Sequence, residues 1–294
     1  MIVIKLDTYE KRQLHLKRLR QLDRTRYFRN IFVASGLWLP FGCFRWSRKE
    51  ENFYPIVFLP DAVACMDSAG LVQLPEIHIC SWKRTGYAGL LNELCKEVEE
   101  DWILSLHERQ IHIREMLPEG SVMPMHRNSE VLMVSSLEPA KAASTTVSCF
   151  NSNNNPHDIS GDSRVVSLRN HGKRACVETG AYNVEMVKYL ETQVVDALVL
   201  VAEDGRWLSR CYLAPRDCQV VEICGLITRE EYRKKGRATK LVMLTVEYLR
   251  RLGVSAVYLT QQRNRAAVRV GTKSGLRQAA TYKKFRIKGS LARG

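Results

Sequence analysis

The sequence predicts a mixed α/β fold, an α+β arrangement built on a mixed sheet. Three observations support this prediction. Hydrophobic residues make up 45% and charged residues 26% of the 294 residues, a composition that can bury a core. Apolar β-branched runs alternate with amphipathic helical spacing in the second half. A cluster of turn formers at 144–163 separates two hydrophobic regions. We therefore expect an α/β region of unknown function at 1–143, a linker at 144–163 and a second domain at 164–294.

The net charge of the chain is +14, which favours acidic partners such as nucleic acid, an anionic membrane surface, an acidic protein face or a polyphosphate ligand. No apolar run approaches the roughly 18 residues that span a bilayer, and the first residues lack the apolar core of a secretory signal. A cytoplasmic location is therefore expected. The nine cysteines form no CxxC pair, so we expect buried thiols and no metal.

The chain begins with a basic amphipathic pattern, in which basic residues between Lys11 and Arg29 alternate with leucines. Such a helix is typical of a nucleic-acid or membrane-surface contact, and it also fits a solvated helix face packed on its own domain. Further on, strands are expected at 31–45 and 54–59 and a helix at 90–116. No internal repeat is evident.

The second half is a series of strands and helices separated by short turns. In chain order we expect a strand at 165–168, a helix at 181–193, strands at 197–202, 207–213 and 220–228, a helix at 237–252, a strand at 254–260, a short helix at 265–273 and a strand at 282–287. The helix at 237–252 presents Leu241, Val242 and Leu249 at helical spacing and stops at Gly253, a common capping residue.

The join between the strand at 220–228 and the helix that follows carries the most specific motif. Backbone N–H groups at a helix N-terminus favour anions, Gly236 lets a phosphate approach the backbone, and basic side chains add positive charge. The motif consists of Arg233, Lys234, Lys235, Gly236, Arg237, Ala238 and Thr239. It predicts a phosphate-binding site, with an ordinary basic helix start as the alternative.

This motif resembles the acetyl-coenzyme A signature of GNAT acetyltransferases, Gln/Arg-x-x-Gly-x-Gly/Ala, with Arg233, Gly236 and Ala238 in the three defined positions. The resemblance covers about residues 165–288 and implies a GNAT-like acyltransferase fold. It further implies transfer of an acetyl group from acetyl-CoA to an amine acceptor, a protein or a small molecule, by direct attack. Two other hypotheses remain open. One is a catalytically impaired protein that binds coenzyme A, and the other is a nucleic-acid or membrane-surface binding protein that acts through its basic N-terminus.

The resemblance also assigns roles to single residues. It implies that the pantetheine arm lies along Leu226, Ile227 and Thr228, that the pyrophosphate lies over 233–239, and that Asn264 contacts the coenzyme. Glu222 stands on the preceding strand, where histone-type members carry their catalytic glutamate.

The apolar neighbours of Glu222 are expected to make it a stronger general base, and the alternative is a side chain that points outward. Where the family often supplies a tyrosine, this chain has Gly271. We therefore consider Tyr282 as the proton donor, with structural packing as its alternative role.

Overall fold

The computed structural model describes residues 4–5, 14, 17, 56–59, 62–67, 76–81, 91, 101–109, 115–117, 120, 122–125, 129–135, 163–193, 196–217 and 220–289. The chain divides into two compact units. The N-terminal unit comprises Met1–Leu132, Gln261–Arg263 and Ala279–Gly294, and the C-terminal unit comprises Met133–Thr260 and Asn264–Gln278. Each half of the sequence therefore contributes a segment to the other unit. The predicted linker at 144–163 lies outside the described residues except for Ser163, which begins a strand.

The N-terminal unit is a mixed sheet. Its strands are β1 (Ile4–Lys5), β2 (Ile56–Leu59), β3 (Ala62–Asp67), β4 (Glu76–Ser81), β5 (Trp102–His107) and β6 (Val122–Pro124). Successive strands from β1 to β4 pair antiparallel, and β4 pairs with β5 in parallel. The next strand is the C-terminal part of β13 (Arg277–Ile287), which pairs antiparallel with both β5 and β6.

Two predictions for the first half can be compared with the described residues. The strand expected at 54–59 is confirmed as β2. The helix expected at 90–116 is wrong over Trp102–His107, which form β5, although Leu91 is helical. All six residues of β5 are buried, so the strand lacks the apolar–polar alternation that would have distinguished it from a buried helix.

The other predictions for the first half lie largely outside the described residues. This applies to the strand at 31–45 and to the basic N-terminal helix, of which only Leu14 and Lys17 are described, both helical and exposed.

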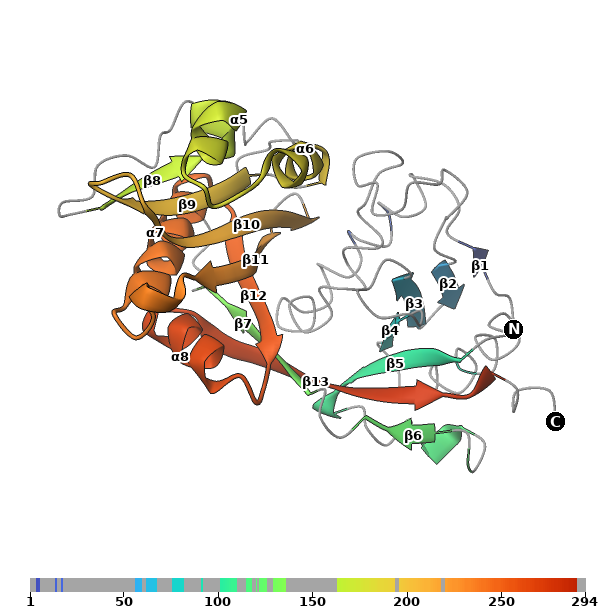
Figure 1. Ribbon diagram of the computed structural model, residues 1–294. Helices are drawn as coiled ribbons and strands as arrows, with labels where there is room; N and C mark the ends of the chain where they lie inside the picture. Colours follow the sequence, from blue (N-terminus) through green and yellow to red (C-terminus); the bar gives the residue numbers. More distant parts are fainter. Residues whose placement is uncertain are drawn as a thin grey trace. The chain divides into compact units, whose positions relative to one another are not determined.

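The C-terminal unit has the same kind of mixed pairing, and its described elements include helices on the sheet (Figure 1). Its elements are β8 (Ser163–Ser167), α5 (Leu168–Glu178), α6 (Val184–Gln193), β9 (Asp196–Ala202), β10 (Trp207–Asp217), β11 (Val220–Thr228), the short 3₁₀ helix η3 (Glu230–Tyr232), α7 (Arg237–Arg251), β12 (Ser255–Gln261) and α8 (Arg265–Lys273). Strands β8 to β11 pair antiparallel in chain order, and β11 pairs with β12 in parallel. The predicted mixed α/β fold is therefore confirmed.

Most elements predicted in the second half are confirmed within a few residues, but α5 was not predicted. Ser167 caps its N-terminus, with a hydroxyl that accepts a hydrogen bond from the backbone N–H of Asn170, and Gly172 interrupts the helix with a non-helical conformation. Its start is fixed by the buried Asp196, which accepts hydrogen bonds from the Ser167 hydroxyl at 2.6 Å and from the Arg169 N–H at 3.0 Å. The interruption hides the helical period from the sequence.

The core of the C-terminal unit is formed where α5 and α6 cover one face of the sheet. Ala197, Val199 and Val201 alternate along β9 and pack against Val187 and Leu190 of α6. Helix α7 lies against β9, β10 and β11 and buries Leu241, Val242 and Leu249, three residues of its predicted apolar face. None of the described helices is long and apolar enough to cross a membrane.

Candidate active site

The central feature of the C-terminal unit is a parallel strand pair that opens part of the way along. Strands β11 and β12 pair at three positions, from Val220 with Ser255 to Glu222 with Val257, and the pairing then stops. Strand β11 continues to Thr228, paired on its other side with β10. Its burial changes at the same place, from continuous burial to an alternation of exposed and half-buried residues. The second half of β11 therefore presents an open strand edge, and such an edge can bind an extended chain.

Gly225 gives the open part of β11 its shape. The register with β10 shifts between Tyr212–Cys224 and Arg210–Ile227, so β11 carries one extra residue, a β-bulge. Gly225 has a φ of +57°, and a Cβ atom built on it would lie 2.2 Å from the Tyr212 ring. Only glycine fits this position. Gly225 is not among the residues predicted for the site, although a glycine within a strand pattern is a signal for a bulge.

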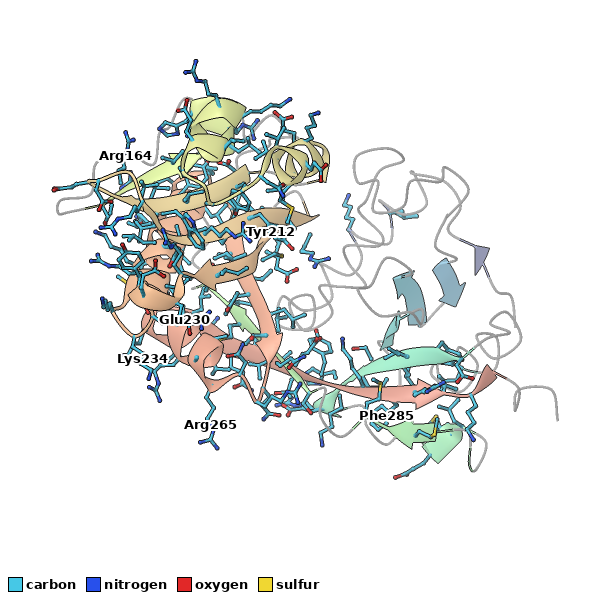
Figure 2. All side chains as sticks on the ribbon, in the orientation of Figure 1. Arg164, Tyr212, Glu230, Lys234, Arg265 and Phe285 are labelled. Carbon is cyan, nitrogen blue, oxygen red and sulfur yellow. The ribbon has the colours of Figure 1, made fainter. Side chains whose placement is uncertain are left out.

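Beyond β11, the predicted phosphate-binding join forms a tight loop before α7. Lys234 has a φ of +61° and Gly236 a φ of +73°, so the chain enters the left-handed region twice within three residues. A non-glycine residue there is uncommon, and such outliers cluster at ligand sites. Lys234 lies exposed on the outside of the unit (Figure 2). A Cβ atom built on Gly236 would meet nothing within 4 Å, so the space above this glycine is open.

Helix α7 begins without a side-chain cap, because its N-cap residue is Gly236. The first backbone hydrogen bond of the helix runs from the Lys240 N–H to the Gly236 carbonyl, which leaves the N–H groups of residues 237–239 without an intrahelical acceptor. The Nε atom of Arg237 is buried, and it has no hydrogen-bond partner in the described part of the chain. Uncapped N–H groups and an unsatisfied guanidinium nitrogen favour an anion at this helix end.

Two other predicted coenzyme contacts have defined partners. The Arg233 Nε donates to the Thr228 carbonyl at 3.3 Å, which ties the loop to the end of β11. Asn264 caps α8, and its side-chain oxygen accepts a hydrogen bond from the Ala267 N–H at 3.1 Å. Ile227 is 43% exposed on the open part of β11, while its neighbours Leu226 and Thr228 are half-buried. All of the predicted coenzyme contacts thus lie in one unit, on β11, the loop, α7 and the start of α8.

Glu222 lies at the last paired position of β11, and its side chain is buried with 6% of its surface exposed. It therefore does not point into solvent. The carboxylate also has a partner that was not predicted from the sequence. The guanidinium of Arg216 on β10 forms an ion pair with the carboxylate, donating to Oε2 from both Nε and Nη2. Such a two-nitrogen contact fixes the orientation of the carboxylate.

The position where the family often has a tyrosine and the proposed donor Tyr282 lie in different settings. Gly271 is buried in α8, and a Cβ atom built on it would lie 2.5 Å from the Met133 sulfur. A tyrosine does not fit there unless Met133 moves. Tyr282 belongs to the N-terminal unit, where its ring packs edge-on against His107 with centroids 6.0 Å apart.

Two other side chains stand close to the point where the strands open. Tyr258 is the first residue of β12 after the last pair, and it is 5% exposed. Burial raises the pKa of Tyr258 to about 12, with smaller contributions from Cys211, Cys224 and Glu222. Burial also raises the pKa of the Cys224 thiol, so this thiol stays protonated at neutral pH and is a poor nucleophile.

Comparisons with known proteins agree with this geometry. Residues 169–275 match the model of the Acetyltransferase (GNAT) family. No curated protein sequence matches the chain.

Three solved structures illustrate the similarity in fold. A GCN5-related N-acetyltransferase from Sphaerobacter thermophilus is 14% identical with a TM-score of 0.51, and 80% of each chain is covered. An acetyltransferase from the GNAT family of Colwellia psychrerythraea is 12% identical with a TM-score of 0.52, and the match covers 98% of this chain and 100% of that chain. A tandem GNAT protein from the clavulanic acid biosynthesis pathway, solved without AcCoA, is 9% identical with a TM-score of 0.56, and 98% of each chain is covered.

At these identities the solved structures show the fold alone, and two of them show it over nearly the whole chain. The family match adds a sequence signal, and it includes the loop, α7 and the start of α8. The chain therefore carries a domain of the GNAT acetyltransferase family in residues 169–275.

Proposed function

We propose that the C-terminal unit transfers an acetyl group from acetyl-CoA to an amine acceptor, a protein or a small molecule. One observation carries this proposal. The open edge of β11, beyond Glu222, leads directly to the uncapped N-terminus of α7. An extended arm with amide groups suits the strand edge, and a pyrophosphate suits the helix end. Acetyl-CoA has both parts and carries its thioester at the far end of the arm.

In this arrangement the pantetheine arm lies along Leu226, Ile227 and Thr228, and the phosphates lie over the loop at 233–239. Gly236 leaves space for them, and the buried Arg237 Nε has a hydrogen bond to donate. The amide nitrogen of Asn264 is a further donor, because the cap of α8 uses only its oxygen. With its phosphates held at α7, the arm directs the thioester back along β11 toward Glu222.

Glu222 is the proposed base. The amine nitrogen attacks the thioester carbonyl carbon, the new C–N bond forms, the C–S bond breaks and sulfur leaves as a thiolate. The amine proton passes to the Glu222 carboxylate directly or through a water molecule. A base matters most for a lysine acceptor, since making its amine neutral costs about 4.6 kcal/mol at pH 7. The ion pair with Arg216 holds the carboxylate in place.

A phenol near the opening would stabilise the leaving thiolate. We propose Tyr258 for this role because it lies in the same unit as Glu222, at the first unpaired position of β12. With a pKa raised to about 12, it stays protonated and donates a hydrogen bond to the sulfur. Tyr282 is the second candidate, and Tyr258→Phe and Tyr282→Phe compared side by side distinguish the two. The protonated Cys224 argues against an acetyl-cysteine intermediate and for direct attack.

The test is isothermal titration of the full-length chain with acetyl-CoA, for the natural protein and Gly236→Glu. The carboxylate would occupy the space of the pyrophosphate and repel it, so affinity is expected to fall by about 100-fold or more. Gly205→Glu is the matched control, because Gly205 is also an exposed glycine with positive φ and open space, on the β9–β10 turn.

Equal affinity in all three proteins would contradict the proposed coenzyme site. Binding without thioester turnover, across a panel of lysine, α-amine and polyamine acceptors, would instead support the catalytically impaired alternative.

A further inference from the structure

The positive charge of the chain is concentrated in its last 63 residues. Residues 232–294 contain 17 basic residues and one acidic residue, Glu247, so this segment carries a formal charge of +16. The rest of the chain contains 28 basic and 30 acidic residues and carries a charge of −2. The proposed phosphate-binding loop at 233–239 accounts for four of the 17 basic residues. Most of the positive charge therefore lies outside the proposed coenzyme site.

Helix α8 displays part of this charge along one exposed face. Arg265, Arg269 and Lys273, here called the α8 row, follow one another at intervals of four residues, so their side chains share a face of the helix. All three are exposed. Figure 2 shows Arg265 pointing away from the helix. On the opposite side Gly271 is buried and the helix packs against α7, so the α8 row is the outward face of the helix.

The α8 row has no acidic partner. Within the described residues, none of its three side chains forms an ion pair or a hydrogen bond. On α7, by contrast, Arg250 and Arg251 are also exposed, and both bind the carboxylate of Glu247. Like charges four residues apart on a helix destabilise it. A polyanion bound along the α8 row would remove this repulsion.

The side chains around the row distinguish between the possible polyanions. A helix that binds a membrane surface inserts large apolar side chains, and a single nucleic-acid strand stacks its bases on aromatic rings. Helix α8 has no aromatic residue, and its two valines are half-buried. The core of a specific protein interface is also apolar or aromatic, whereas the other exposed residues of this helix are Ala266 and Thr272. The face therefore offers cations and little else.

A nucleic-acid duplex suits such a face, because its outer surface is a continuous line of phosphates. The α8 row spans eight residues, or about 12 Å of helix, and a DNA duplex carries one negative charge per roughly 1.7 Å. Several phosphates can therefore lie within reach of the row without a matched register. DNA is favoured over duplex RNA because the major groove of B-DNA is wide enough to admit a helix, whereas that of RNA is narrow.

We propose that the α8 row is a docking surface for double-stranded DNA, which it binds through the phosphate backbone and without sequence preference. The two guanidinium groups of the row donate to phosphate oxygens, and the lysine adds a third positive charge. Docking through α8 does not depend on coenzyme binding. It would bring the C-terminal unit to amine acceptors that are themselves bound to DNA.

The experiment is fluorescence anisotropy of a labelled DNA duplex titrated with the full-length chain, at salt concentrations from roughly 50 to 200 mM. The natural protein is compared with two double variants, Arg269→Gln/Lys273→Gln on α8 and Arg250→Gln/Arg251→Gln on α7. Each double variant removes two exposed positive charges, so the two proteins have the same net charge and differ only in where the charge is lost.

The α8 variant is expected to bind the duplex about tenfold more weakly at moderate salt, because two phosphate contacts are lost. The slope of log K against log salt should become shallower by about 2. The α7 variant should change affinity by less than about threefold, since charges beyond a Debye length from the duplex are screened. The α8 variant should also melt at the same or a higher temperature, because repulsion within the row is reduced.

Four other outcomes would contradict the proposal. Equal losses in the two variants would show that binding follows net charge and would overturn the assignment to α8. No binding of the natural protein at the lowest salt concentration would overturn the docking surface. Tighter binding to duplex RNA, polyglutamate or anionic phospholipid vesicles would overturn DNA as the partner. A loss of coenzyme A affinity in the α8 variant would assign the row to the coenzyme site instead, whereas unchanged affinity is expected.

Discussion

The two parallel strand pairs have the same backbone pairing and differ in their side chains. Both β4–β5 and β11–β12 pair at three positions and then open. At the last pair, the C-terminal unit has Glu222 bound to Arg216, whereas the N-terminal unit has His78 and Ser105, whose hydroxyl has no hydrogen-bond partner among the described residues. A bulge at Gly225 shapes β11, whereas β4 contains no glycine.

The opening of a strand pair and the chemistry at the opening are therefore separate properties. The opening depends on where backbone pairing stops, and it is present twice. The chemistry depends on a few side chains, and the base with its guanidinium partner is described only in the C-terminal unit. We propose transfer for the C-terminal unit alone, and the following substitutions test how the two units differ.

The largest effect is expected from Gly225→Ala, because this substitution disrupts the glycine bulge of β11, which has no counterpart in β4. An alanine there is strained at a φ of +57°, and its Cβ would overlap the Tyr212 ring. We expect a loss of about 2 to 4 kcal/mol in the free energy of unfolding and weaker coenzyme binding at the C-terminal site. Urea denaturation and titration measure the two effects.

The control for this prediction is Tyr212→Ala combined with Gly225→Ala. Compared with Tyr212→Ala alone, which accounts for the lost packing of the ring, the double variant should lose only the backbone strain of about 1 to 2 kcal/mol. A single Gly225→Ala variant that is as stable as the natural protein would contradict the bulge as described.

The second largest effect is expected from a change of Glu222, the proposed base. Glu222→Gln is expected to lower turnover by about 100-fold at neutral pH with coenzyme affinity kept, because the amide cannot accept the amine proton. With a lysine acceptor the rate should rise toward high pH, as the neutral amine becomes populated. Initial rates between pH 7 and 10 measure this profile.

Two further variants test whether the base and its partner act only in the C-terminal unit. His78→Gln changes the same register position in the N-terminal unit and should leave turnover unchanged. Arg216→Gln leaves a buried carboxylate without its partner and should lower both turnover and stability. Equal reductions of turnover in Glu222→Gln and His78→Gln would contradict the proposal that transfer takes place in the C-terminal unit alone.

The smallest effect is expected at Gly271, where the family often has a tyrosine. Gly271→Ala should change stability by less than about 1 kcal/mol, since the gain in helix propensity offsets the displacement of the flexible Met133 side chain. Gly271→Tyr should destabilise by about 1 to 3 kcal/mol without raising turnover, because the ring has no space. Thermal melts and initial rates of both variants provide the check. A faster and equally stable Gly271→Tyr would show instead that a catalytic residue is missing here.

Much of the C-terminal unit could be predicted because its signals are local. The strand at 220–228 and the helix at 265–273 were predicted with their observed bounds, and the helix before Gly253 within one residue. The basic glycine motif was placed at the start of α7, where the structure has it. Prediction failed where the local period was hidden, as in the fully buried β5 and in α5 with its interruption at Gly172.

The order of the elements in the second half, the basic glycine join before α7 and the carboxylate on the strand before it all follow from the sequence alone. These follow from side-chain periodicity and turn chemistry within short windows. Only the tertiary structure decided that the pairing of β11 and β12 stops at Glu222, that Arg216 binds this residue, and that the end of β13 belongs to the N-terminal unit. The physical reason is that strand partners and ion pairs are selected by contacts between segments far apart in the chain, and these leave no local period in the sequence.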